Sequence, residues 1–224
     1  MKRMIPLFFV VVVIMIFSAM PALATSITFE MNHEFSGATP PESVQLPWLT
    51  ATFDDNDVPG SVELTLSSTH LTDAEYVKEW CFNLDPSLDP VALAIAQTSG
   101  VPVLSITQGE NFYQADGDGL YDIRFDFPEK KADCFGVGDS AVFMITLAGI
   151  TADSFNFLSE PAGGHGPFYS AAHVGGIGDD DEDSGWIAPR NGETPVPEPA
   201  TMLLFGTGLI GIAGFGRKKL TKRT

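Results

Sequence analysis

The sequence predicts an all-β fold, an antiparallel β-sandwich with a jelly-roll-like arrangement. About ten short runs along the chain have the apolar or alternating pattern that is typical of strands in such sandwiches. Turn residues separate these runs, and the chain contains 22 Gly and 16 Pro. In the run over residues 120–127, Ile123, Phe125 and Phe127 alternate with polar residues, as expected for a strand with one solvated face. The number of strands does not distinguish a jelly roll from an immunoglobulin-like arrangement.

Each expected strand is a short run that ends at a turn. In chain order the strands cover residues 27–31, 49–53, 62–67, 76–84, 91–96, 101–106, 120–127, 142–147, 154–158 and 168–174. The clearest alternation places Val62, Leu64 and Leu66 on one face. Residues 88–98 could instead form a short helix, because their alanines weaken the strand pattern.

Four segments follow from the composition along the chain. Residues 1–24 form a signal peptide, residues 25–174 the β-sandwich domain, residues 175–195 an acidic Gly/Pro-rich linker, and residues 196–224 a sorting tail. In the linker the acidic residues 179–183 repel one another, and Trp186 could still dock on the domain.

The N-terminal segment has the three parts of a secretory signal. Lys2 and Arg3 precede the apolar residues 5–17, and Ala22 and Ala24 are the small residues that signal peptidase reads. We therefore expect cleavage before Thr25. A retained N-terminal anchor is the alternative interpretation, since no charge occurs between Arg3 and Glu30.

The C-terminal segment has three parts in a fixed order. The triplet Pro197, Glu198 and Pro199 leads into the uncharged residues 200–216, and the basic residues Arg217, Lys218 and Lys219 follow. Seventeen residues at the helical rise give about 25 Å, slightly short of the roughly 30 Å hydrocarbon core. With Val196 or the basic flank included, the segment can still span a membrane with little tilt. The basic residues stay cytoplasmic by the positive-inside rule, which leaves the domain outside the inner membrane.

This order resembles the PEP-CTERM sorting tail of exported bacterial proteins, a tail sometimes labelled the C-terminus of ice-binding proteins. The resemblance implies recognition of the triplet by exosortase, a membrane protease-transpeptidase, while the helix and its basic stop hold the chain in the membrane. It also implies a bacterium of the Gram-negative type that makes exopolysaccharide. Residues 47–53, 82–86, 171–174 and 184–187 resemble segments that recur in a group of PEP-CTERM proteins.

The charge of the exported part excludes one class of function. Residues 25–199 contain all 29 Asp and Glu but only 5 of the 12 Lys and Arg, so the net charge is 5 − 29 = −24. A domain this acidic is repelled by nucleic acid and by anionic lipid. We therefore expect no nucleic-acid partner.

Acidic loops are candidates for calcium binding, because hard oxygen ligands at alternate positions suit this ion. The candidates are Asp54 and Asn56 in one loop and Asp116 and Asp118 in another. Neither loop fits an EF-hand, and Asp, Asn and Gly are also ordinary β-turn residues. Structural calcium is thus a possible cofactor, and no other cofactor is expected.

The two cysteines, Cys81 and Cys134, both fall in the exported part, where disulfides persist. We expect them to pair, which would stabilise the fold by roughly 3–4 kcal/mol. Two buried thiols or a metal pair are the alternatives.

No pattern identifies a catalytic residue. His165 and His173 lack the partners of a zinc site, and Ser184 lies in the expected linker. Paired carboxylates of a glycosidase could lie close by chance among so many acids. For stacking on sugar rings, Trp48 and Tyr113 are expected to be exposed, whereas Trp80 is expected in the core.

Together these observations predict a non-enzymatic envelope or extracellular-matrix protein that makes weak contact with exopolysaccharide. The expected route is export through the inner membrane, transient anchoring by the C-terminal helix, and then the cell surface or matrix. A secreted polysaccharide hydrolase and a calcium-dependent adhesin are the alternatives.

Overall fold

The structure is a computed structural model that describes residues 25–40, 46–72, 74–129, 132–190 and 196–197. The expected signal peptide, Glu198, Pro199, the tail helix and its basic stop lie outside these residues. Within the described part, none of the helices has the length and apolar character needed to cross a membrane.

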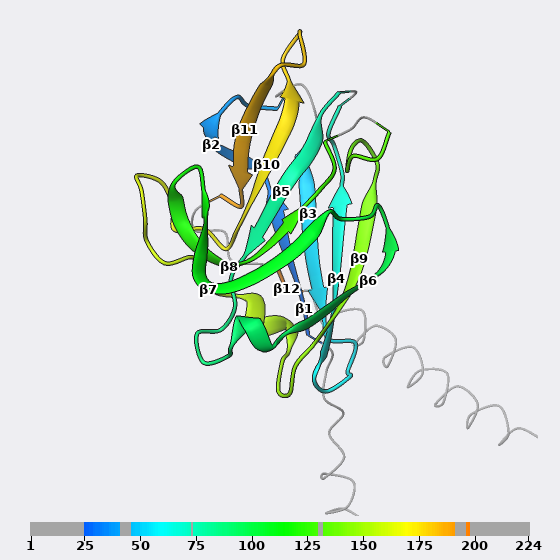
Figure 1. Cartoon of the computed structure of the whole chain (residues 1–224), viewed down its shortest axis with the longest axis vertical. Helices are drawn as coiled ribbons and strands as arrows, with labels where there is room; N and C mark the ends of the chain where they lie inside the picture. The colour runs from blue at the N-terminus through cyan, green and yellow to red at the C-terminus, as the bar shows by residue number, and fades with distance from the viewer. Residues whose placement is uncertain (1–24, 41–45, 73, 130–131, 191–195, 198–224) are drawn as a thin grey trace, which may run out of the picture.

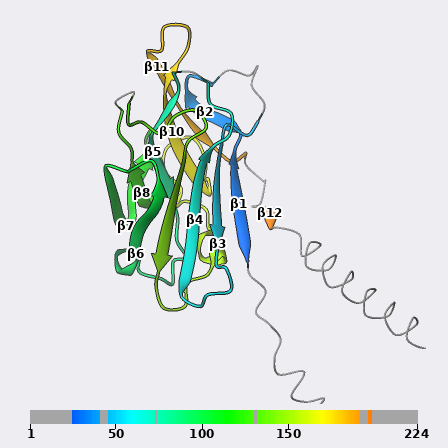
Figure 2. The same ribbon diagram turned by 90° about the vertical axis from the view of Figure 1, so that its right-hand side faces the viewer.

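Twelve described strands form two antiparallel sheets that face each other (Figures 1 and 2). The first sheet has the order β12-β1-β3-β4-β9-β6, and the second has the order β2-β11-β10-β5-β8-β7. The strands are β1 (Ser26–Met31), β2 (His33–Gly37), β3 (Leu49–Asp54), β4 (Ser61–Ser68), β5 (Tyr76–Phe82), β6 (Ala94–Gly100), β7 (Ser105–Ala115), β8 (Asp118–Asp126), β9 (Ser140–Thr146), β10 (Ser170–Ile177), β11 (Asp183–Ala188) and β12 (Val196–Pro197). Two short 3₁₀ helices, η1 (Pro90–Ala92) and η2 (Ala152–Phe155), lie in the loops.

The main core lies between the sheets and follows the alternation of their strands. In the first sheet Phe53 pairs with Leu64, and both side chains are buried. From the second sheet Phe82 meets Phe53 edge-on, with ring centroids 5.3 Å apart. Burial of such large side chains from both layers supplies the driving force for the sandwich.

A second apolar cluster covers part of the outer face of the second sheet. It contains Cys81, Tyr121, Phe168 and Trp186, all buried. The register between β7 and β8 shifts between Gln108 and Tyr113, and the end of this hairpin curls over the sheet (Figure 1). The cluster therefore fixes where the β7–β8 hairpin lies, and with it one wall of the pocket described below.

Residues 175–188, expected to be part of a linker, belong to the domain, so the predicted boundary at residue 174 is wrong. β10 continues to Ile177, and β11 pairs with both β10 and β2. The acidic run forms the turn between them, where Gly178 and Asp181 have positive φ values of 91° and 59°. Charge repulsion within the run is compatible with a solvated hairpin turn, and Trp186 and Ile187 hold the following strand by their burial.

Several other segments differ from the expected elements. Residues 154–158 do not form a strand, because η2 begins at Ala152 and buries Ala152, Ser154 and Phe155 without alternation. The expected strand at 91–96 begins instead with η1 and continues as β6. The strand order also differs from an eight-stranded jelly roll, since each sheet has six strands and β3–β4, β7–β8 and β10–β11 are hairpins within single sheets.

The predicted disulfide is also wrong, because Cys81 and Cys134 are not bonded to each other. Val77 on β5 pairs with Phe135, the neighbour of Cys134, and Cys81 lies four residues farther along the strand. Four residues of strand span about 13 Å, whereas a disulfide requires Cα atoms about 4.4–6.8 Å apart.

Candidate functional site

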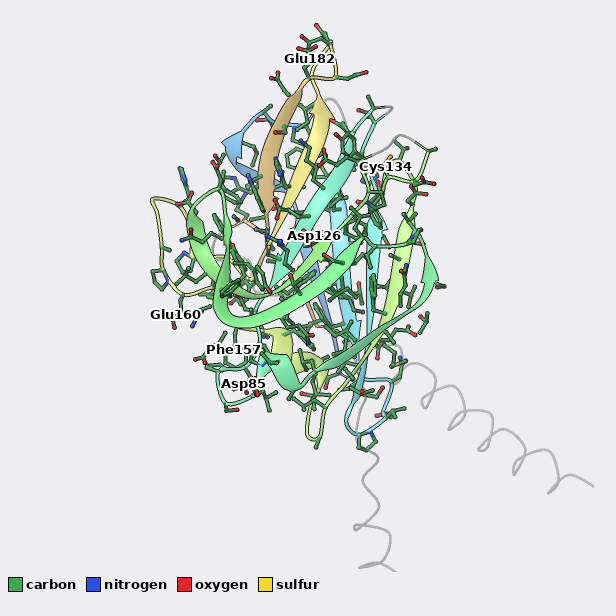
Figure 3. The ribbon with its side chains drawn as sticks, in the orientation of Figure 1. Asp85, Asp126, Cys134, Phe157, Glu160 and Glu182 are labelled. Atoms are coloured by element: carbon green, nitrogen blue, oxygen red, sulfur yellow. The ribbon has the colours of Figure 1, made fainter. Side chains whose placement is uncertain are left out.

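The candidate site is a pocket at one end of the second sheet, with a volume of about 160 Å³. We call it the loop pocket and define it by six of its lining residues: Asn83, Asp85, Glu110, Asp122, Phe157 and Glu160. They come from four parts of the chain: the end of β5 with the loop after it, β7, β8, and the loop after η2. Figure 3 shows Asp85, Phe157 and Glu160 in the same lower region of the molecule.

Asp122 holds two of these parts together. Its Oδ2 accepts a hydrogen bond from the backbone N–H of Leu84 at 2.8 Å, and its Oδ1 accepts one from the N–H of Asn111 at 2.8 Å. Asn111 has a positive φ of 50° at the irregular part of β7. The buried carboxylate thus fixes the loop after β5 against the β7–β8 hairpin and shapes the base of the pocket.

Asn83 is the most deeply buried polar residue of the pocket, with only 2% of its surface exposed. Its Nδ2 donates hydrogen bonds to the carbonyl oxygens of Phe168 at 3.1 Å and Tyr169 at 3.0 Å. Both donors of the amide are therefore used on the protein side. Its Oδ1 accepts no hydrogen bond within the described part of the chain and is left for the pocket.

Asp85 lies at the outer side of the pocket and is partly exposed. Hydrogen bonds from the side chain and the backbone N–H of Ser87 hold the pKa of this carboxyl below its usual value. Asp85 is therefore an ionised acceptor at neutral pH.

The lining of the pocket is acidic. It includes the carboxylates of Asp85, Glu110, Asp122 and Glu160 but no Lys, Arg or His side chain. Phe157 and Leu158 add apolar surface beside them. The pocket therefore suits a ligand that donates hydrogen bonds, carries positive charge, or does both.

The first pair of calcium candidates lies in the turn after β3. Asp54 Oδ1 accepts a hydrogen bond from the backbone N–H of Asn56 at 2.8 Å, and Asn56 has a positive φ of 47°. This is the hydrogen bond of an ordinary Asx turn.

The second pair ties neighbouring loops to the β7–β8 turn. Asp118 accepts hydrogen bonds from the backbone N–H of His165 at 2.9 Å and from its Nδ1 at 2.7 Å, and Ser36 donates to Asp116. Burial raises the pKa of Asp118, but the hydrogen bonds from His165 and Gly164 outweigh burial and lower it. In the described part of the chain no three His, Cys, Asp or Glu side chains are grouped closely enough to hold a metal ion. Calcium binding stays a prediction.

The aromatic residues expected at the surface lie elsewhere. Trp48 and Tyr113 are only 3% and 7% exposed, so neither offers a face for stacking on a sugar ring. Trp48 borders a second hollow of about 410 Å³, with His33, Glu34 and Arg190, and its Nε1 has no hydrogen-bond partner among the described residues. Trp80 is fully buried, as expected.

A row of polar side chains crosses the outer face of the second sheet. Trp186 pairs with His173, and their rings stack with centroids 4.8 Å apart. Glu79 follows, 3.5 Å from His173 Nδ1, and Arg124 lies 3.7 Å from the same carboxylate. Ser184 is the second residue of β11, and no described histidine is hydrogen-bonded to it. The row has no feature of a nucleophilic site.

The sorting triplet is only partly described. Pro197 is the last residue of β12 and pairs with Ile27 of β1. β1 begins at Ser26, and the expected signal-peptide cleavage is before Thr25, the preceding residue. Glu198 and Pro199 lie outside the described residues, as do Ala22, Ala24 and the basic stop.

The loop pocket was not predicted from the sequence. Its residues are far apart in the chain, and the single acids look like turn or surface residues when they are read one at a time. The available signals were polar residues at 83–85, directly after β5, and at 110–111, in the middle of β7.

The described residues form an all-β domain of two antiparallel sheets with an acidic pocket at one end of the second sheet. The chain carries the PEP-CTERM protein-sorting motif, which matches residues 195–218. This motif implies export and processing by exosortase. The chain is therefore a PEP-CTERM domain-containing protein.

No curated protein sequence matches the chain. A solved structure of biomass-sensing modules from RsgI-like proteins of Clostridium thermocellum, described as resembling the family 3 carbohydrate-binding module of the cellulosome, is similar with a TM-score of 0.32 and 12% identity. The match covers 69% of this chain and 95% of that chain. A likeness at this TM-score supports no conclusion about the present chain.

Proposed function

We propose that this chain is an envelope or extracellular-matrix protein that exosortase sorts, and that its β domain is a non-enzymatic structural module in weak contact with exopolysaccharide. The observation that carries the proposal is the sorting motif at residues 195–218, which follows an all-β domain. In this proposal the tail helix anchors the chain transiently, and processing then leaves the domain at the cell surface or in the matrix.

The loop pocket supports the contact with glycan. Sugar hydroxyls are hydrogen-bond donors, and Asn83, Asp85, Glu110 and Glu160 offer acceptor atoms to them. The ring of Phe157 adds an apolar surface on which the C–H face of a sugar can rest. The pocket is small, which fits weak contact with one unit of a long polymer.

The same residues favour a role without catalysis. A glycosidase needs one carboxyl group with a raised pKa to act as the general acid. The pKa of Asp85 is lowered instead, and both oxygens of Asp122 are occupied by backbone N–H groups. These two carboxylates therefore suit binding and positioning better than proton transfer.

The test is binding of the exported protein, purified from its producing cells, to the organism's own exopolysaccharide, with calcium and with a chelator. Saturable binding without loss of polymer length is the expected result. Shortening of the polymer would overturn the non-enzymatic role in favour of a hydrolase. A lower melting temperature in chelator would favour a calcium-dependent adhesin, and absence of binding would overturn the glycan contact.

A further inference from the structure

We propose that the loop pocket binds a protonated amino sugar, a sugar unit whose free amine carries a positive charge. This inference rests on the proposed function, because it names the class of glycan that the pocket would contact.

The pocket lining carries negative charge with no positive charge beside it. Asp85, Glu110, Asp122 and Glu160 bring four carboxylates to a pocket whose lining has no cationic side chain. No ion pair joins any of the four to a cation in the described part of the chain. A ligand that brings an ammonium group would supply the missing charge and form charge-assisted hydrogen bonds.

The side-chain amide of Asn83 is a second recognition group, and it does not depend on these charges. Asn83 lines the pocket, and only 2% of its surface is exposed. Since its Nδ2 is committed to Phe168 and Tyr169, the carbonyl oxygen is the atom that faces the pocket. This oxygen can only accept a hydrogen bond, so it also selects a ligand with an N–H or O–H donor.

The pocket fits an organic cation better than a metal ion. Calcium requires six to eight oxygen ligands at about 2.3–2.6 Å. Among the described residues no three carboxylates are close enough to surround an ion in this way. The pocket volume of about 160 Å³ is several times the roughly 30 Å³ that one water molecule takes in the liquid. The site is therefore wide enough for an amine and the part of the sugar ring that carries it.

The apolar side of the pocket and the charge of the whole domain also favour a cationic sugar. Phe157 and Leu158 offer apolar surface next to the carboxylates, and an aromatic ring also attracts a cation. With 29 acidic residues in the exported part, the domain repels acidic polysaccharides and attracts cationic ones. A glycan with free amines satisfies both conditions.

The experiment compares a glucosamine oligomer with its fully N-acetylated counterpart of equal length, by calorimetry on the exported protein at low salt and mildly acidic pH. Acetylation removes the charge and leaves the ring. We expect the acetylated oligomer to bind about tenfold more weakly, since one charge-assisted hydrogen bond is lost. Equal binding of the two oligomers would overturn the inference.

Two matched variants distinguish binding at the pocket from general attraction by the negative charge of the domain. Glu160→Gln removes one charge at the pocket, and Glu182→Gln removes one at the β10–β11 turn, at the other end of the molecule (Figure 3). Both residues are exposed, so neither change should disturb the fold. We expect Glu160→Gln to weaken binding about threefold and Glu182→Gln to leave it unchanged. Equal weakening by both would overturn the pocket as the site.

A further comparison keeps this inference separate from the proposed function. If the protein binds the organism's exopolysaccharide but not the glucosamine oligomer, the amino-sugar inference fails and the proposed function stands. If it binds neither, both fail.

Discussion

Glu75 is a carboxylic acid at a place that water scarcely reaches, with 4% of its surface exposed. Its Oε2 accepts hydrogen bonds from the backbone N–H of Thr72 at 2.6 Å and from the Thr72 hydroxyl at 3.1 Å. Its Oε1 is buried and has no partner among the described residues. Burial raises the pKa of Glu75 above the ordinary value of 4.5, and the hydrogen bonds from Thr72 only partly oppose this effect.

This environment predicts the effect of Glu75→Gln on stability. Because the folded-state pKa of Glu75 is raised, its contribution is favourable at low pH and is lost as pH rises through that pKa. At neutral pH the neutral amide should therefore raise the free energy of unfolding by about 1 kcal/mol. Urea unfolding at acidic and neutral pH measures this, with Glu63→Gln on β4 as the control. An equal gain for Glu75→Gln at both pH values would contradict the argument.

Cys81 predicts a second result at the scale of single residues. The thiol is fully buried and lies far from Cys134, and burial raises its pKa well above the usual value. A reductant should therefore leave the melting temperature of the exported protein unchanged, because no bond between these cysteines contributes to stability. Thermal unfolding with and without reductant measures this, and peptide mapping of the unreduced protein should find no Cys81–Cys134 cross-link. A fall in melting temperature with reductant would contradict this argument and support a disulfide between the two cysteines.

Single residues also show why exposure was harder to predict than burial. Trp80 sits in the middle of a strand, where alternation indicates the buried face, and its burial is confirmed. Trp48 and Tyr113 lie next to turns, and a turn in the sequence does not show what packs over it. Tyr113 follows the irregular part of β7, so the curled hairpin places it in the outer cluster.

At the scale of elements, β11 is the strand whose presence most changes the domain. Gly185 pairs with Val174 of β10 and with Gly37 of β2. A Cβ atom on Gly185 would lie 1.9 Å from the carbonyl oxygen of Ala38. No side chain fits at that distance, so this position requires glycine as long as β2 and β11 are paired.

Gly185→Ala should therefore lower the free energy of unfolding by about 1–3 kcal/mol, the usual cost of forcing an extra methyl group into a packed site. Gly164→Ala is the matched control, because a Cβ atom there would have no neighbour within 4 Å. Urea unfolding of both variants measures the difference. If residues 175–195 were a linker, the two variants would be equally stable.

The elements that were predicted well are those with one buried face. β3, β4 and β8 alternate over six residues or more, and the structure has strands at these positions. β7 gave no such signal, because much of it is exposed and it includes Gly109 and Asn111 at its irregular centre. β11 was missed because its burial depends on neighbours that the local pattern does not reveal.

At the scale of the whole molecule, the loop pocket could not be predicted for a related reason. Its walls come from segments near residues 83, 110, 122 and 157, which the two sheets bring together only after folding. The sorting motif, in contrast, is a continuous segment that carries its own pattern, and its prediction is confirmed.

The two-sheet fold also brings the expected signal-peptide cleavage position and the start of the sorting tail to β1. Thr25 directly precedes β1, and β12, which contains Pro197, pairs with β1. The Thr25 backbone nitrogen lies 2.9 Å from Asp55 Oδ1. Cleavage before Thr25 would turn this nitrogen into an ammonium group and the hydrogen bond into an ion pair.

We expect protein that begins at Thr25 to be more stable by about 0.5 kcal/mol than protein that begins at Ala24. Urea unfolding of both forms, each with and without Asp55→Asn, measures the coupling. The difference should vanish in Asp55→Asn and above about pH 8, where the amine loses its charge; a difference that persists in both cases would rule out the ion pair.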